Sequence, residues 1–339
     1  MKTALIGLGM VSSTFADAIS NSKSVDLKWI FARSSDSRQA FLNEYPNLGA
    51  HSADSIEAIA NDREVDFVIL ATPPNARMDI IDLLIQAGKP VLMEKPVERT
   101  LTAATAIVEK CEAANNPLGI VLQHRFRPVV ADMRRVAKML GPLHAVECNV
   151  PWWRPQSYYN ELGRGTYARD GGGVMISQAI HIMDLMLSLT GQAAEVTAMQ
   201  ATTGLHQMES EDFVSAGLRF ESGAVGHLFA TTASFPGRGE SITLHYQNGS
   251  ACLERGKLQV DRHDGTSDTF GQVLGSGSGA NPMAFSSDAH RFVIEDFAEA
   301  VQDGRPPKVT GREALRVHRL IAALEKSALT GAKTALKDI

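Results

Sequence analysis

Short apolar runs alternate with helical patterns through the first 120 residues, and this alternation constrains the fold more than any other feature. Residues 65–71 (VDFVILA) are the strongest of these runs. Strands that alternate with helices at this spacing predict right-handed βαβ units and a parallel sheet. We expect strands at 3–6, 27–32, 65–71, 90–94 and 119–123, and helices at 11–20, 36–45, 54–60, 76–87 and 101–114.

The pattern changes after about residue 123, where strands come to alternate with turn signals. The tripeptides ESG at 221–223 and QNG at 247–249 supply hairpin turns, and successive hairpins predict an antiparallel sheet. Residues 264–284 are rich in Gly and Ser and are interpreted as a mobile loop. We expect helices at 129–140, 174–189, 287–302 and 311–329, and strands at 213–220, 224–232 and 241–245.

The length of 339 residues exceeds what one hydrophobic core usually serves, so we expect two domains, at 1–122 and 123–339. With 33 Lys and Arg against 38 Asp and Glu, the net charge of −5 gives no reason to expect nucleic acid or a membrane as partner. Three scattered cysteines predict neither a disulfide framework nor a zinc site, and we expect no metal. Without a leader peptide or an 18-residue apolar run, the protein is expected to be cytoplasmic.

A glycine-rich turn, GLGMVS at residues 7–12, follows the first strand and opens the first helix. It nearly fits G-x-G-x-x-G, in which the first glycine permits a tight turn and the second lets the backbone approach a pyrophosphate. Ser12 departs from the third glycine but is small enough for helix–strand packing. The helix N-terminus favours an anion. The turn therefore predicts a dinucleotide site, with a purely structural turn as the alternative, and its residues would be Gly7, Gly9, Met10 and Val11.

The end of the second strand bears on the choice between NAD and NADP. An NAD site usually has Asp or Glu there to hold the ribose 2′-hydroxyl. Arg33 stands there instead, 24 residues after Gly9, followed by Ser34 and Ser35, although Asp36 is close. A guanidinium and hydroxyls complement a 2′-phosphate, so Arg33 and Ser34 favour NADP slightly over NAD. NAD, with Arg33 as a solvated loop residue, is the alternative.

Further motifs lie at the ends of later strands and beyond. They are Ala71-Thr72-Pro73-Pro74-Asn75, Glu94-Lys95-Pro96, His124-Arg125-Phe126-Arg127-Pro128, and Gly171-Gly172-Gly173 with His181 and Asp184. In this order they resemble the Gfo/Idh/MocA oxidoreductases (glucose–fructose oxidoreductase, inositol dehydrogenase and relatives) over nearly the full length. The resemblance implies an α/β protein with an N-terminal Rossmann dinucleotide-binding domain. It also implies a C-terminal α/β domain for substrate binding and oligomerisation, with an open, mostly antiparallel sheet.

The resemblance extends the cofactor site beyond the glycine turn. Asn75 is available to hydrogen-bond near the nicotinamide ribose, and Glu94 is interpreted as a supporting group rather than a chemical one. Arg77 stands where the family frequently has His, and it either adds positive charge or is a solvated residue at a helix N-terminus. The complete cofactor prediction is Gly7, Gly9, Met10, Val11, Arg33, Ser34, Ala71, Thr72, Pro73, Asn75, Glu94 and Lys95.

Oxidation of a secondary alcohol moves a hydride to the nicotinamide and a proton to a base. Lys95 follows a parallel strand, at the edge where such sheets bind ligands, and the matching lysine of the family is catalytic. His181 suits a proton acceptor near neutral pH, and Asp184 follows at i+3, where it orients His181 or contacts the substrate. Ser177 replaces an Asp of inositol-dehydrogenase-like members, so His181 or Lys95 alone must carry the proton. Structural roles for Lys95 and His181 are the alternatives, and the Lys95–Pro96 bond is a candidate for the cis form.

The stretch WWRPQSYY at 152–159 is the most unusual in composition. Its aromatic rings suit the apolar faces of sugars, and Arg154 suits hydroxyls or a carboxylate, with a loop anchor or subunit contact as the alternative. Arg125 is a candidate anchor for an anionic substrate or a cofactor phosphate, or alternatively for a salt bridge between domains. The predicted substrate contacts are Lys95, Arg125, Trp153, Arg154, Ser177 and His181.

These observations favour an NAD(P)-dependent dehydrogenase that oxidises or reduces a secondary alcohol or ketone of a sugar, cyclitol or sugar acid. Lys95 and His181 would handle the proton, and Asp184 would orient. The expected partners are a small sugar or polyol and a second copy of the chain, in a homodimer or homotetramer formed through the C-terminal sheet. Two alternatives are a reductase of a dihydrodiol or imine on the same scaffold, and a cofactor-bound regulatory protein without turnover.

Overall fold

The computed structural model describes residues 1–275, 277–280 and 285–339. These fall into two compact units. Unit 1 comprises Met1–Gln123 and Ser286–Leu315, and unit 2 comprises His124–Phe285 and Arg316–Ile339. The sequence predicted a single boundary after residue 122, with all later residues in the second domain. The structure differs because residues 286–315 belong to unit 1.

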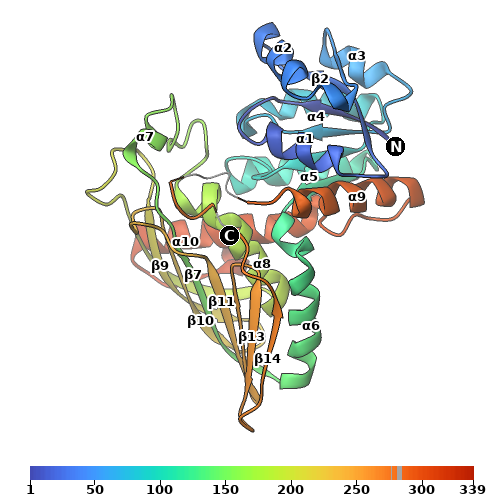
Figure 1. Cartoon of the computed structure of the whole chain (residues 1–339). Coiled ribbons are helices and arrows are strands. Elements are labelled where there is room, and N and C mark those ends of the chain that lie inside the picture. The colour runs from blue at the N-terminus through green and yellow to red at the C-terminus, as the bar shows by residue number, and fades with distance from the viewer. Residues whose placement is uncertain (276, 281–284) are drawn as a thin grey trace. The chain divides into compact units, whose positions relative to one another are not determined.

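Unit 1 is built on a parallel sheet flanked by helices (Figure 1). Among the described residues the sheet has six strands, in the order β3-β2-β1-β4-β5-β6. This is the order of a doubly wound dinucleotide-binding fold, and it confirms the predicted βαβ alternation. Strands β4, β5 and β6 are buried at every position, so both faces of the sheet are covered. The elements are β1 (Lys2–Ile6), α1 (Ser12–Ser20), β2 (Asp26–Phe31), α2 (Ser35–Glu44), β3 (His51–Ser52), α3 (Ile56–Asn61), β4 (Phe67–Leu70), α4 (Met78–Gln86), β5 (Val91–Glu94), α5 (Leu101–Ala113) and β6 (Leu118–Val121).

Helix α9 (Asp288–Asp303) packs within unit 1, although it comes late in the sequence. The ring of Phe297 lies 5.4 Å from that of Phe67 in β4, and His290 lies 5.7 Å from Phe15 in α1, measured between ring centroids. A Cβ atom at Gly119 in β6 would lie 2.5 Å from the Phe297 ring. Glycine at this position therefore lets α9 approach the sheet closely.

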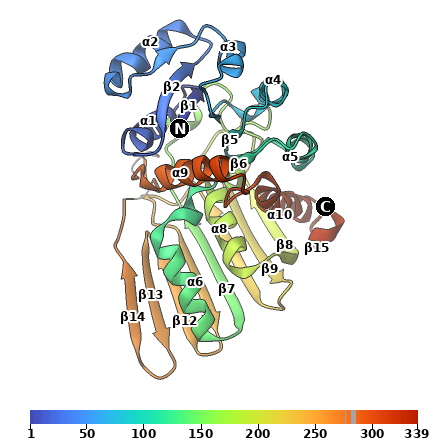
Figure 2. The same ribbon diagram turned by 90° about the vertical axis from the view of Figure 1, so that its right-hand side faces the viewer.

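Unit 2 contains a mixed sheet, which has nine strands within the described part of the chain, in the order β14-β13-β12-β11-β7-β10-β9-β8-β15 (Figure 2). Only β7 and β10 pair in parallel among these strands, so the predicted, mostly antiparallel sheet is confirmed. Helices α6 and α8 pack against it. The elements are α6 (Pro128–Leu140), β7 (Leu143–Pro151), α7 (Gln156–Tyr159), α8 (Ile180–Thr190), β8 (Ala193–Ala201), β9 (Phe213–Phe220), β10 (Val225–Thr231), β11 (Ser241–Tyr246), β12 (Gly249–Glu254), β13 (Lys257–Arg262), β14 (Ser267–Gly271), α10 (Gly311–Thr330) and β15 (Thr334–Ala335).

Two expectations for unit 2 need correction. The predicted mobile loop at 264–284 contains β14, because β13 offers the chain an antiparallel partner; residues 276 and 281–284 of that prediction lie outside the described residues. The helix expected at 174–189 begins instead as a π-helical turn, η4 (Met175–Ala179), and only then continues as α8.

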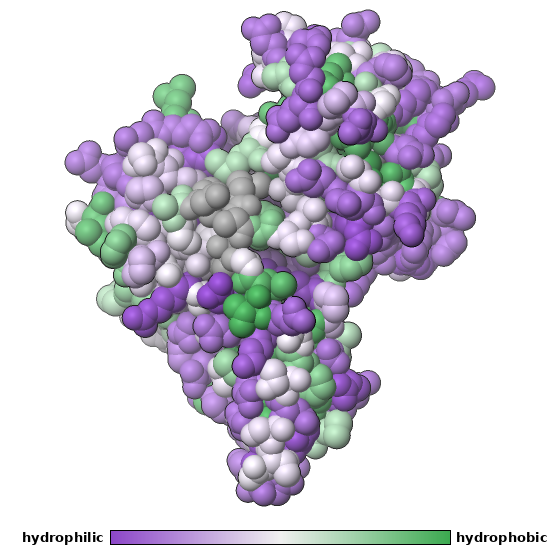
Figure 3. All heavy atoms as spheres, in the orientation of Figure 1, coloured by the Kyte–Doolittle hydropathy of each residue, from purple (hydrophilic) through white to green (hydrophobic). Residues whose placement is uncertain are grey.

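The strand positions that point away from α6 and α8 are partly exposed. Strand β9 alternates buried residues with exposed Ser215, Gly217 and Arg219, so its outward face is polar. Met199 in β8 and Val225 in β10 are 60% and 46% exposed. Polar residues cover most of the face seen in Figure 3, with apolar residues in small groups. Among the described residues, no helix is both long and apolar enough to span a membrane.

Candidate functional site

The two glycines of the turn between β1 and α1 differ in what surrounds them. Gly7 has φ +104°, and a Cβ atom there would lie 2.6 Å from the carbonyl carbon of Ala71. Its N–H also donates to the carbonyl of Phe31, 2.8 Å away, so Gly7 joins the ends of β1, β2 and β4. Gly9 has nothing within 4 Å of the position of a Cβ atom. Gly7 is required by the fold, whereas Gly9 leaves open space at the start of α1.

That open space suits the pyrophosphate of a dinucleotide. Helix α1 has no side-chain cap and no acidic residue in its first turn, so nothing of that kind competes with an anion at its N-terminus. Met10 and Val11 lie directly before the helix, and Met10 is 48% exposed. The residues predicted from the glycine pattern therefore fit the group they were expected to hold.

The tip of β2 carries the residues predicted to read the ribose. Arg33 is exposed, and none of the ion pairs among the described residues involves it. The Ser34 side chain caps α2 by accepting from the N–H of Ser37, 3.2 Å away. Arg38, which was not among the predicted residues, donates to the carbonyl of Ala32 at 2.5 Å and to the Ser52 hydroxyl at 2.9 Å. Arg38 thus stabilises the segment after β2 through Ala32 and Ser52, whereas the guanidinium of Arg33 is exposed to solvent.

The ends of β4 and β5 present buried polar atoms. The Thr72 hydroxyl and Glu94 Oε2 are buried and have no hydrogen-bond partner among the described residues. Burial raises the pKa of Glu94, and the charges of Lys95 and Arg77 oppose that rise. Lys95 follows Glu94 directly, is half-buried, and its bond to Pro96 is cis as expected. Unpartnered polar atoms at this edge of a parallel sheet suit the polar groups of a ligand.

The neighbouring predicted residues divide by burial. Pro73, just before the short turn η2 (Pro74–Ala76), and Asn75, within it, are exposed, whereas Ala71 is half-buried. Arg77 is only 2% exposed, so its interpretation as a solvated residue is wrong. Its guanidinium turns inward toward main-chain carbonyls of this edge, which the sequence did not indicate.

In unit 2, the helix after the glycine triplet is capped by Glu211. Glu211 Oε2 and Oε1 accept from the N–H groups of Gly173 and Met175, at 3.0 and 3.1 Å, and its main-chain carbonyl accepts from Val174 at 2.9 Å. A Cβ atom at Gly173 would lie 1.7 Å from that carbonyl oxygen, so glycine is required there. Burial raises the pKa of Glu211, and these N–H groups oppose the rise. No local pattern predicts this cap, because Glu211 is 38 residues from Gly173.

Asp184 and Arg125 form a buried ion pair. Arg125 Nε and Nη2 donate to Asp184 Oδ2 and Oδ1 at 2.7 and 2.5 Å, and the two side chains are 5% and 0% exposed. From the sequence, Asp184 was expected to contact His181 or the substrate, and Arg125 to bind an anionic substrate or a cofactor phosphate or to form a salt bridge between domains. The structure instead brings them together inside unit 2, in a bidentate geometry that holds the segment after β6 against α8.

His181 in α8 stacks on His124. Their ring centroids are 5.1 Å apart with planes 26° from parallel, and both rings are buried. Arg127 Nη2 lies 2.7 Å from His124 Nε2. A guanidinium only donates, so His124 Nε2 accepts and His124 carries its proton on Nδ1. The contact between His124 of the HRFRP motif and His181 was not predicted, because 57 residues separate them in the sequence.

The aromatic segment encloses Arg154. Arg154 is 2% exposed, donates to the carbonyls of Trp153 and Gly279 at 2.8 and 2.6 Å, and lies over the rings of Trp152 and Tyr158. Burial lowers the pKa of Arg154. The side chain thus anchors a loop, which was the alternative to its predicted role in substrate binding. Trp153 is half-buried.

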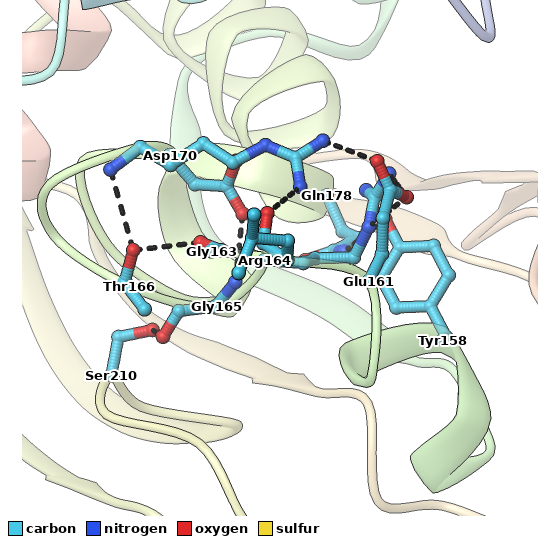
Figure 4. Close-up of polar contacts among 11 residues, drawn as sticks. Tyr158, Glu161, Gly163, Arg164, Gly165, Thr166, Asp170, Gln178 and Ser210 are labelled. Carbon is cyan, nitrogen blue, oxygen red and sulfur yellow. Dashed lines mark hydrogen bonds and ion pairs between the residues drawn. The ribbon is translucent and has the colours of Figure 1, made fainter.

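A polar network ties the neighbouring loop to the π-helical turn (Figure 4). The Tyr158 hydroxyl accepts from Arg164 Nη1 at 2.8 Å and from Gln178 Nε2 at 3.3 Å. Arg164 also pairs with Glu161. Gln178 Oε1 is buried and has no partner among the described residues, and half-buried Ser177 precedes it in the turn. Gln178 is therefore a further candidate for a substrate contact.

Two family models match the chain. A model described as the oxidoreductase family with an NAD-binding Rossmann fold matches residues 1–121. A model of the Gfo/Idh/MocA C-terminal domain matches residues 133–252.

Individual relatives match at low identity. The uncharacterized protein YMR315W of Saccharomyces cerevisiae is 25% identical over 59% of this chain and 58% of its own length. The 1,5-anhydro-D-fructose reductase of Ensifer adhaerens is 26% identical over 83% of this chain and 82% of its own. The WlbA dehydrogenase of Bordetella pertussis, solved with NADH and UDP-GlcNAcA, has a TM-score of 0.83 at 24% identity, over 99% of this chain and 97% of that one.

Proposed function

The chain belongs to the Gfo/Idh/MocA family of NAD-binding oxidoreductases, and on that premise we propose that it acts as a dehydrogenase on a sugar, cyclitol or sugar acid. The observation that carries the proposal is the position of Lys95. It directly follows β5 at the carboxyl edge of the parallel sheet, next to the unpartnered carboxyl oxygen of buried Glu94. Ligands of doubly wound sheets bind at this edge.

The bound nicotinamide supplies the acceptor or donor of the hydride. In the oxidative direction, Lys95 donates a hydrogen bond to the substrate oxygen and stabilises the charge that develops there. His181 takes the hydroxyl proton as the carbon–hydrogen bond breaks, and Ser177 hydrogen-bonds the substrate. In the reductive direction the same groups return the proton. Asp184 has an indirect role: its ion pair orients Arg125, the candidate anchor for an anionic substrate or a cofactor phosphate.

We assign a slight preference for NADP to the tip of β2. The exposed guanidinium of Arg33 and the hydroxyls beside it suit a 2′-phosphate, and no carboxylate among the described residues pairs with Arg33. The proposal also takes in Arg38, whose contacts with Ala32 and Ser52 brace the tip.

The substrate class follows the family and its relatives. One relative is named for a reductase of 1,5-anhydro-D-fructose, and another was solved with UDP-GlcNAcA, so both a neutral sugar and a sugar acid are represented. The half-buried ring of Trp153 supports a sugar-type substrate in this chain. Because Arg154 is occupied by main-chain carbonyls, we do not expect it to supply the charge for a carboxylate.

A second copy of the chain is proposed as partner through the outward face of the mixed sheet. Partly exposed Met199 and Val225 on that face support it. Analytical ultracentrifugation should show a dimer or tetramer. The double variant Met199→Glu/Val225→Glu should weaken the association of the subunits. A monomer at micromolar concentration would contradict this assignment. We also propose a cytoplasmic location, which the three free cysteines support.

The test is an absorbance assay at the reduced-nicotinamide band with sugars, cyclitols and sugar acids, each with NAD and with NADP. We expect turnover with at least one of them, and loss of about 100-fold or more in Lys95→Met with cofactor binding retained. Undiminished turnover in Lys95→Met would overturn the assignment. Turnover only with dihydrodiols or imines would support a different reductase, and cofactor binding without any turnover would support a regulatory protein.

A further inference from the structure

Arg77 is a buried cation that binds main-chain carbonyls at the ends of two strands of unit 1, β4 and β5. It lies between η2 and α4, and its side chain is among the largest that are fully buried. Nε and Nη2 donate to the carbonyl of Thr72 after β4, at 3.1 and 2.7 Å. Nη1 donates to the carbonyl of Glu94 at 2.5 Å, to that of Pro96, and to that of Val97 at 3.3 Å.

These acceptors enclose Lys95. The Glu94 carbonyl belongs to the peptide unit that enters Lys95, and the Pro96 carbonyl lies one residue beyond it. One guanidinium therefore holds the main chain on both sides of Lys95 and ties it to the end of β4. A planar fork of donors fixes direction as well as distance, which a single ammonium does not.

The charge of Arg77 persists despite burial. Burial lowers the pKa of Arg77 to about 10, and the carboxylates of Glu94 and Glu98 oppose that change. At neutral pH the group is therefore a cation, and each carbonyl bond is charge-assisted. Such a clamp resists the small displacements that matter for a group that must meet a substrate oxygen.

Lys89 offers a direct comparison at the other end of the same strand. Its ammonium is also buried and donates to two main-chain carbonyls, those of Asp62 and Val65, at 2.6 and 2.7 Å. Lys89 thus stabilises unit 1 in a similar way, but before β5 rather than after it. Replacing Lys89 should therefore affect stability alone, whereas replacing Arg77 should affect both stability and the position of Lys95.

We propose that Arg77 is a positioning residue for catalysis, which orients Lys95 by binding the carbonyls that flank it. The inference rests on the proposed role of Lys95 and deepens it, because Arg77 acts through Lys95 rather than by touching substrate or cofactor. It predicts that loss of Arg77 acts on turnover through Lys95 rather than through stability alone.

The first experiment is a set of variants: Arg77→Met, Arg77→Lys, Lys89→Met, Lys95→Met and the double variant Arg77→Met/Lys95→Met. We measure kcat and KM per folded molecule, with the sugar that gives turnover. Arg77→Met should lower kcat by about 10- to 100-fold with cofactor KM nearly unchanged, since a misplacement of about 1 Å has effects of that size. Arg77→Lys should recover part of the loss, and Lys89→Met should lower the melting temperature without lowering kcat.

The double variant isolates the link to Lys95. With Lys95 already replaced, the further change Arg77→Met should alter residual turnover by less than about twofold, because the group it positions is gone. An equal fold-loss in both backgrounds would overturn the inference. So would an unchanged kcat in Arg77→Met.

A second readout needs no turnover and serves if Arg77→Met folds poorly. Reductive methylation with formaldehyde and a borohydride, followed by peptide mass spectrometry, measures how fast half-buried Lys95 reacts. Its rate relative to exposed Lys138 should change at least about twofold in Arg77→Lys and stay the same in Lys89→Met. Equal relative rates in all three proteins would overturn the inference. The proposed function fails on a different result, namely full turnover in Lys95→Met.

Discussion

At the residue scale, the two glycines of the turn between β1 and α1 are needed for different reasons. Gly7 is required because of its positive φ and because the backbone at Ala71 leaves no room for a Cβ atom. Gly9 meets no such limit, since the space beside it is open. Such an open position suits a pyrophosphate, which must approach the backbone closely, and we propose this as the reason for glycine at position 9.

Gly9→Val should leave stability unchanged and weaken cofactor binding by at least about tenfold, since the added side chain occupies the pyrophosphate's space. Thermal unfolding and titration of NADH fluorescence measure the two effects. Gly204→Val is the matched control, because Gly204 also has nothing within 4 Å of a Cβ atom. Unaltered NADH affinity in Gly9→Val would refute the assigned site.

Arg33→Ala should weaken NADP binding by about tenfold and NAD binding by less than about twofold, because a charge-assisted hydrogen bond is worth about 1.5–3 kcal/mol. Dissociation constants for both cofactors give the ratio. Arg63→Ala is the control, as Arg63 is another exposed arginine of unit 1. A parallel change for NAD and NADP would remove Arg33 from the choice between them.

At the element scale, the start of the His181 helix depends on acids from distant parts of unit 2. Glu211 caps the first N–H groups, and Glu325 in α10 lies near it. A Cβ atom at Gly172 would lie 3.8 Å from Glu325 Oε1 and 3.9 Å from Glu211 Oε2, so both carboxyls approach the same glycine. Burial, and then the charge of Glu211, raises the pKa of Glu325 to about 7.

This rise makes stability depend on pH. Because the pKa of Glu325 is higher in the folded state than its ordinary value of 4.5, folding is favoured at low pH, and that contribution is lost as pH rises through about 7. Glu325→Gln should therefore gain melting temperature relative to the native protein between pH 5 and pH 8. Glu254→Gln, at an exposed position, should show no such trend. A difference that does not vary with pH would contradict the close approach of the two acids.

At the scale of the whole molecule, the chain crosses from unit 1 to unit 2 and returns. Helix α9 belongs to unit 1 although it follows most strands of the mixed sheet in the sequence, and the chain crosses to unit 2 again within α10. The nucleotide-binding unit is therefore discontinuous in sequence. Its stability should depend on residues nearly 300 positions from its first strand.

Phe297→Ala should lower the free energy of unfolding by about 3–5 kcal/mol, the usual cost of removing a fully buried phenylalanine. Urea denaturation followed by fluorescence measures it. The control is Phe235→Ala, because Phe235 is 76% exposed. A cost below about 1 kcal/mol would mean that α9 contributes little to unit 1.

The candidate site was predictable wherever its signal was local. Gly7, Gly9 and Lys95 belong to short motifs placed by the strands before them, and the strands themselves follow from apolar runs. Arg77 was not predictable, because the sequence shows its position beside a helix but not the carbonyls around its guanidinium. Arg125 and Asp184 were both identified from the sequence, but only the structure shows that they form an ion pair with each other.

The sequence by itself determined the alternation of strands and helices, the glycine turn, the two-part organisation and the family, because periodicity and turn chemistry act between residues close in the chain. The tertiary structure alone decided that Glu211 caps the His181 helix, that His124 stacks on His181, and that α9 returns to unit 1. Burial and charge pairing depend on residues that meet only after folding, and no local pattern encodes which distant side chain will arrive.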